Sequence, residues 1–86
     1  MDDARDKYSS VTGKVASTEQ MFNKIKQDLE SKGLSVRSDT LARVIQMKMS
    51  LEQAKENLDR GSVAAALRNL SAAEAQSARI NKEYGQ

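Results

Sequence analysis

The side chains of this chain that could do chemistry are carboxylates, lysines, tyrosines and serines, because its 86 residues include no histidine and no cysteine. The two missing types supply most of the general bases, thiol nucleophiles and transition-metal ligands in proteins. The serines therefore have no histidine to activate them as nucleophiles. The four glycines are spread along the chain and form no phosphate-binding loop. We expect a protein that is not an enzyme and that carries no cofactor and no metal ion.

Three aspartates and two tyrosines are the remaining candidates for chemistry. Asp2, Asp3 and Asp6 lack the loop spacing with glycine that a calcium site needs. They fit the first turns of a helix, whose positive end favours carboxylates. Tyr8 and Tyr84 are expected to pack their rings at the ends of a helical bundle and to leave their hydroxyl groups in water. We interpret all five residues as structural.

The length and composition predict one small helical domain over residues 1–86. Charged residues make up 30% of the chain and hydrophobic residues 38%, a balance typical of a soluble globular domain rather than a disordered tail. The chain has no proline, which is the strongest helix breaker. Its net charge of +2 comes from 14 basic and 12 acidic residues, which are interspersed rather than grouped.

Neither a membrane span nor a targeting segment is expected in this sequence. No apolar run approaches the roughly 20 residues that a membrane span needs. The first residues, Met-Asp-Asp-Ala-Arg-Asp-Lys, contain no apolar signal segment. The sequence is equally compatible with a domain of a longer protein, secreted or anchored, and it indicates no compartment.

Two glycine-containing breaks, at 31–35 and 59–62, divide the chain into three helical segments. The expected helices span about 2–32, 38–60 and 62–83. Ser38 or Asp39 is expected to be the N-cap of the second helix, and Ser62 the N-cap of the third.

Apolar residues of the first segment recur at heptad spacing and predict one buried face. This face consists of Tyr8, Val11, Val15, Thr18, Phe22, Ile25 and Leu29. Residues 9–13 are poor helix formers, so we expect the first third of this helix to be frayed or kinked. Ser17 and Gln20 fit a capping box and offer an alternative helix start near Thr18.

The other two segments each carry an apolar face as well. The face of the second segment consists of Val44, Met47, Leu51, Ala54 and Leu58. The face of the third consists of Val63, Ala66, Leu67, Leu70, Ala73, Ser77, Ile80 and Tyr84. Three amphipathic helices joined by short breaks predict an all-α fold, an antiparallel three-helix bundle. The alternative is a helical hairpin with a loosely held first helix.

Small and large residues follow one another at regular spacing around the second break. They are Ala54, Leu58, Gly61, Ser62, Ala66, Leu70 and Ala73. This spacing, within residues 54–73, resembles that of a tetratricopeptide (TPR) helical hairpin. The resemblance implies that the second hairpin of the bundle is TPR-like, and it suggests protein–protein interaction by analogy. The family's aromatic positions are absent, no proline follows the third segment, and no second copy is present, so a repeat array is not implied.

A second apolar set on the middle helix is the best candidate for a binding site. Leu41, Ile45 and Met49 follow one another at i, i+4 spacing, beside the core-forming face. One interpretation is an exposed strip that docks a helix of another protein, or a second copy of this chain as a homodimer. The alternative is that the loop after Gly33, with Leu34 and Val36, folds over the strip.

Six basic residues around the first break form a weaker candidate surface. They are Lys24, Lys26, Lys32, Arg37, Arg43 and Lys48. Asp28, Glu30 and Asp39 interrupt them, which favours a solvated surface of mixed charge over a nucleic-acid-binding patch. The expected function is therefore a protein-interaction module. The alternatives are a weak nucleic-acid-binding domain that uses residues 24–48, and a structural spacer of a larger protein.

Overall fold

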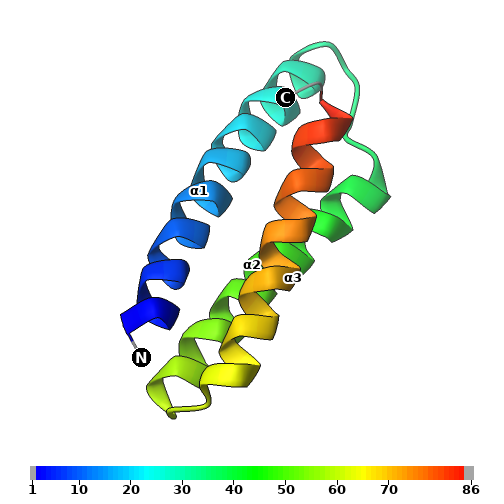
Figure 1. Ribbon diagram of the computed structural model, residues 1–86. Coiled ribbons are helices and arrows are strands. Elements are labelled where there is room, and N and C mark those ends of the chain that lie inside the picture. The colour runs from blue at the N-terminus through cyan, green and yellow to red at the C-terminus, as the bar shows by residue number, and fades with distance from the viewer. Residues whose placement is uncertain (1, 85–86) are drawn as a thin grey trace.

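The computed structural model describes residues 2–84 and contains three α-helices in that range: α1 (Asp2–Ser31), α2 (Ser38–Asp59) and α3 (Val63–Glu83). They run up, down and up as an elongated bundle, so that the start of α1 lies near the α2–α3 turn (Figure 1). The all-α three-helix bundle predicted from the sequence is confirmed. Each helix differs from its expected range by at most one residue at either end.

Both breaks are helix ends closed by a glycine in the left-handed conformation. Gly33 has φ of 75°, and its N–H donates to the carbonyl of Glu30 at 3.0 Å, while the N–H of Leu34 donates to the carbonyl of Leu29 at 2.8 Å. The same pair of hydrogen bonds recurs around Gly61, which has φ of 80°. This pattern is the Schellman motif, and it requires the positive φ that glycine adopts without a steric cost.

The starts of α2 and α3 match the sequence prediction less well. The N-cap of α2 is Arg37, because its carbonyl accepts the first helical hydrogen bond, from the N–H of Leu41 at 3.1 Å. The assignment of Ser38 or Asp39 as the cap was therefore wrong by one or two positions. Ser62 is the N-cap of α3 as predicted, although its hydroxyl makes no capping hydrogen bond within the described residues.

The first third of α1 is helical without interruption, although the sequence indicated fraying, a kink or a start near Thr18. Val11 and Val15 are buried in the main core, and this burial outweighs the low helix propensity of the segment. The hydroxyl of Thr12, in the same segment, donates to the carbonyl of Tyr8 at 2.7 Å and so has its hydrogen-bond partner inside the helix.

The core lies along the common axis of the three helices. Its buried residues are Val11, Val15, Phe22, Val44, Met47, Ala54, Leu70, Ala73 and Ile80. A smaller cluster of Ala4, Leu58 and Ala66 closes the end beside the α2–α3 turn. Leu67, expected on the core face, is instead 39% exposed. The packing of α2 against α3 is the most extensive and that of α1 against α2 the least, so the bundle is most open between α1 and α2.

A buried polar link joins α1 to α3. Thr18 and Ser77 are almost fully buried, and their hydroxyl oxygens lie 2.6 Å apart. The hydroxyl of Thr18 also donates to the side-chain carbonyl of Asn81 at 3.1 Å. Because a hydroxyl has one proton, Ser77 is the donor in the first of these bonds. Thr18, the one polar residue of the predicted seam, therefore has partners for its hydroxyl group.

Candidate functional site

The apolar strip of α2 is exposed. The exposed fractions of Leu41, Ile45 and Met49 are 39%, 50% and 52%. The loop that follows Gly33 does not cover them, because Leu34 is itself 57% exposed and Val36 packs against the main core. The alternative in which this loop folds over the strip was therefore wrong.

An open groove of about 500 Å³ lies between α1 and α2, beside this strip. We call it the α1–α2 groove. It is lined by Tyr8, Thr12, Val15, Ala16 and Glu19 of α1 and by Ile45, Lys48, Met49, Leu51, Glu52 and Lys55 of α2. Two of the three predicted strip residues therefore belong to the groove, and Leu41 does not. The α1 side of the groove could not be predicted from the sequence, since only the packing of the helices brings it opposite α2.

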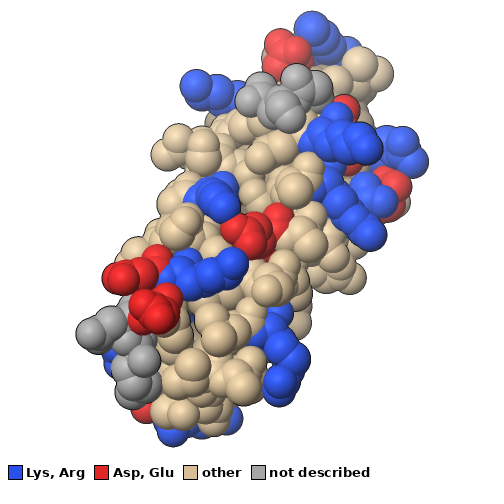
Figure 2. All heavy atoms as spheres, viewed as in Figure 1, with Lys and Arg blue, Asp and Glu red and all other residues tan. Residues whose placement is uncertain are grey.

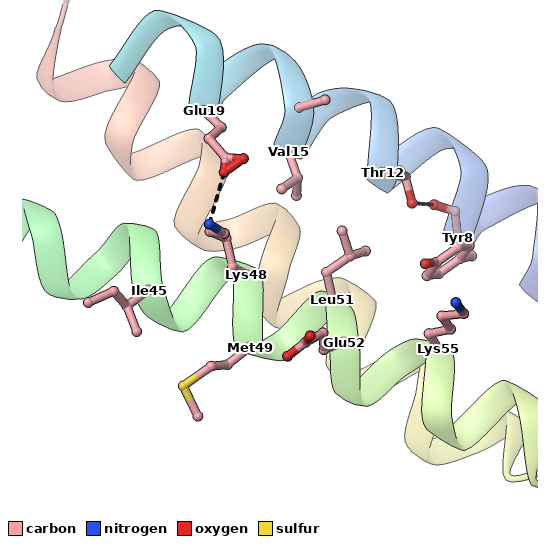
Figure 3. A pocket seen from close by; sticks show the side chains of 11 residues that line it. Tyr8, Thr12, Val15, Glu19, Ile45, Lys48, Met49, Leu51, Glu52 and Lys55 are labelled. Atoms are coloured by element: carbon pink, nitrogen blue, oxygen red, sulfur yellow. Dashed lines mark hydrogen bonds and ion pairs between the residues drawn. The ribbon is translucent and has the colours of Figure 1, made fainter. Parts of the chain in front are cut away.

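Figure 3 shows how these side chains are arranged. Val15 and Leu51 point into the space between the helices and form the apolar floor. Ile45 and Met49 project from α2 away from α1 and form the outer lip. Thr12 and Ala16 have short side chains, so the α1 wall leaves this space unfilled. The groove exists because apolar residues occupy a wider arc of α2 than two neighbouring helices can cover.

Charged residues border the groove without giving it a net charge. Lys48 and Glu19 form an ion pair of 3.2 Å between Nζ and Oε2 that spans from α2 to α1. Glu52 and Lys55 have no ion-pair partner among the described side chains of residues 3–84. A ligand of the groove would therefore be held mainly by apolar contact, and these two charges would select complementary charges on it.

The six predicted basic residues do not form one patch. Four of them are paired with carboxylates: Lys32 with Asp28 at 3.1 Å, Arg37 with Asp39 at 3.0 Å, Arg43 with Glu83 at 3.5 Å, and Lys48 with Glu19. Lys24 and Lys26 lie on α1, one to two turns before its C-terminal end. Basic and acidic atoms alternate over the face shown in Figure 2, with no continuous basic stripe.

A shallow polar hollow of about 400 Å³ does gather basic residues from two helices. Arg37, the N-cap of α2, and Arg43 of α2 meet Arg79 and Lys82 of α3 around it, together with Asp39 and Glu83. Arg79 and Lys82 could not be selected from the sequence, because only the antiparallel packing brings the end of α3 beside the start of α2. The two carboxylates reduce the positive charge of this hollow.

Two ionisable groups have shifted pKa values. The pKa of Glu74 is lowered below its ordinary value of 4.5, chiefly by the hydrogen bond from Lys14 and then by that from Lys7, so this carboxylate links α3 to α1. The pKa of Tyr84 is raised, first by burial and then by the charge of Glu83. Neither group lines the α1–α2 groove.

The aspartates of the first turns show no sign of a ligand site. Asp3 and Asp6 are exposed on α1, and the side chain of Asp2 lies outside the described part of the structure. Among the described side chains, those of residues 3–84, no three acidic groups are close enough together to hold a metal ion. None of the three helices within residues 2–84 has the length and apolarity that crossing a membrane requires.

Comparison with other proteins gives no family for this chain. No protein-family model, no curated protein and no solved structure matches it.

Proposed function

We propose that this chain is a non-catalytic protein-interaction module that docks a helix through the α1–α2 groove and the apolar strip of α2. The observation that carries the proposal is the exposure of Ile45 and Met49 at the lip of an apolar groove. Single exposed apolar residues are common, but apolar residues in a row beside an apolar hollow are typical of binding surfaces. A docked helix would remove both residues and the groove floor from water.

The shape of the site fits a helix. Leu41, Ile45 and Met49 are spaced i, i+4, i+8 and form one ridge along α2. A third helix packs against two others when its side chains enter the groove between them, and amphipathic helices bind grooves of this kind through residues at the same spacing. The methionine adds a flexible side chain that can adapt to the surface of its partner.

We further propose that α2 and α3 form a TPR-like hairpin that serves as the rigid support of the site. The complete burial of Ala54, Ala66, Leu70 and Ala73 supports this, because small residues at these positions let the two helices pack closely. Because the buried face of α2 packs against α3, the strip on its exposed side is held in a fixed orientation.

The proposal is tested by titrating the isotope-labelled protein with amphipathic helical peptides and following backbone amide signals by NMR. We expect the signals of Val15, Ile45 and Met49 to shift and that of Leu67 to stay. The I45K/M49E variant should bind at least about tenfold more weakly, since buried apolar anchors carry most of the binding energy. The control is L67K, which changes an apolar residue of similar exposure on α3. If no peptide shifts the groove signals, or if I45K/M49E binds as well as L67K, the proposal is wrong.

The two alternative functions predict different titrations. A nucleic-acid binder would show an affinity for oligonucleotides that falls steeply as the salt concentration rises. The affinity for a helical peptide docked by apolar contact would change little over the same range of salt. The pairing of four of the six candidate basic residues with carboxylates weighs against the nucleic-acid interpretation. A structural spacer would bind neither class of ligand.

A further inference from the structure

The two ends of the apolar strip lie in different surroundings. Ile45 and Met49 line the α1–α2 groove, but Leu41, one turn earlier on the same ridge, lies outside it. Leu41 is 39% exposed, and a ligand that filled only the groove would leave this apolar surface in water. The occupant should therefore present a groove-filling side chain to Met49 and an apolar surface to Leu41.

We infer that the occupant is a second copy of this chain, whose α2 lies antiparallel to the first across a two-fold axis at Ile45. This inference rests on the proposed docking function of the same surface. Across such an axis, residues equally far from Ile45 on either side face each other, because the contact is self-complementary. Leu41 of each copy then meets Met49 of the other at its groove, and the two Ile45 side chains meet at the centre.

The charges at the ends of the strip are complementary in the same register. Glu52 lies seven residues after Ile45, so it faces Ser38, seven residues before it, in the second copy. Arg37 and Asp39 flank Ser38 and pair with each other at 3.0 Å, and the side chain of Arg37 is 75% exposed. The start of α2 also carries the positive end of the helix dipole. Glu52, which has no ion-pair partner among the described side chains of residues 3–84, would thus approach the positive end of α2 in the second copy and share Arg37 with Asp39.

No two residues directly opposite each other along the strip carry like charges in this register. Lys48 faces Ala42 of the second copy, a small residue that leaves room for the ion pair of Lys48 with Glu19. Asp39 likewise stands opposite the uncharged Leu51, whereas Met47, opposite Arg43, is fully buried in its own copy and takes no part in the contact. Repulsion between like charges is a common way to exclude wrong pairings, so its absence in this register favours the dimer.

The contact is small, and the dimer should therefore be weak. A stable interface usually covers about 800 Å² on each partner, whereas this one consists of a single ridge and one groove per copy. We expect a dissociation constant on the order of 10–100 μM. The exchange between monomer and dimer should then be observable at ordinary laboratory concentrations.

Sedimentation equilibrium from about 5 to about 500 μM, a range that spans this constant, is the first test. The mass should rise from that of the 9.5 kDa chain towards twice that value. I45K places two lysines at the axis and should weaken association at least about tenfold, while L67K should leave it unchanged. Circular dichroism establishes that both variants are folded. A dimer that I45K does not weaken, or that L67K weakens equally, overturns the inference.

Disulfide formation tests the register, because the chain has no cysteine of its own. I45C should oxidise to a covalent dimer on its own, since a disulfide needs Cβ atoms about 4 Å apart. L41C and M49C should cross-link when mixed and much less when each is oxidised alone. In a parallel dimer, each cysteine would instead form a disulfide with the same position of the second copy. Efficient L41C self-coupling, or cross-linking by L67C equal to that of I45C, overturns the antiparallel register.

The outcome for the second copy can be separated from the outcome for the docking function. A chain that stays monomeric at every concentration overturns the dimer. If helical peptides still shift the signals of Ile45 and Met49 in that monomer, the docking function stands and the natural occupant is a different protein. If neither self-association nor peptide binding occurs, both proposals are wrong.

Discussion

The link between α1 and α3 is the feature of the fold whose energy can be measured most directly, through Thr18 and Ser77. Thr18→Val keeps the shape of the side chain and removes the acceptor of the Ser77 proton. It also removes the donor to the side-chain carbonyl of Asn81, which is only half-buried and can bond to water instead. The buried serine hydroxyl then lacks its partner, which usually costs about 1–3 kcal/mol. Ser77 can turn to the backbone carbonyl of its own helix, so we expect the lower part of this range, about 1–2 kcal/mol.

Ser77→Ala has a smaller expected cost. Thr18 keeps its hydrogen bond to Asn81, at 3.1 Å, and loses only the bond from Ser77. We expect about 1 kcal/mol, the typical net value of one buried hydrogen bond. The double variant replaces both hydroxyls by apolar groups and leaves neither unpaired, so its total cost should be only about 0–1 kcal/mol. The two single changes are thus expected to be strongly non-additive.

The assay is urea unfolding of the four proteins, followed by circular dichroism. For a domain of this size, 1 kcal/mol corresponds to about 4–8 °C in Tm, so thermal unfolding gives an independent reading. The measurements are made at a protein concentration at which the chain is monomeric. All four proteins should then share one m value. If the double variant is destabilised by the full sum of the single variants, the two hydroxyls do not stabilise each other and the reasoning is refuted.

Three further predictions concern the turns, the first helix and pH. Gly61→Ala should destabilise the protein by about 1 kcal/mol, because its φ of 80° is strained for alanine; unchanged urea unfolding would contradict this. Gly13→Ala should stabilise it by about 0.5–1 kcal/mol, because Gly13 is helical and a methyl group there meets nothing within 4 Å. Glu74→Gln should be less stable than the wild type near neutral pH. Since the pKa of Glu74 is lowered in the folded state, its contribution is present above the ordinary value of 4.5 and is lost as pH falls below it. The difference between Glu74→Gln and wild type should therefore vanish in acid, and a difference independent of pH would show that these ion pairs are not its cause.

The fold could be predicted from the sequence because local signals agree with each other. The glycines at 33 and 61 end their helices as expected, and the heptad seam of α1 contains its buried residues, Val11 and Phe22 among them, except for Ala4. The weak propensity of residues 9–13 misled the prediction for α1, because propensity does not include the packing of Val11 against the other helices. The cap of α2 was misplaced because a serine or aspartate at a helix start need not supply the capping bond.

The site could be predicted only in part. The spacing of Leu41, Ile45 and Met49 identified the apolar strip, but no pattern within the helix shows whether the loop that precedes it will cover the strip. The α1 wall of the groove, with Thr12 and Ala16, depends on how two helices pack, and so does the grouping of Arg79 and Lys82 beside α2. These are pairings between segments far apart in the chain, which a single sequence does not encode in local form.

The distribution of polar groups around α2 provides a last test of why the strip is apolar. Towards α3, α2 presents amides that pair across the helices, as Gln46 does with Gln76 at 3.2 Å. Away from both neighbours, where polar residues would serve a monomer best, it presents Ile45 and Met49. If these residues serve binding and not folding, Ile45→Gln should change the free energy of unfolding of the monomer by less than about 1 kcal/mol. Met47→Ala, at a fully buried position of the same helix, should cost about 2–5 kcal/mol. A loss for Ile45→Gln as large as that for Met47→Ala would mean that the strip stabilises the bundle itself, and the case for an interface would fall with it.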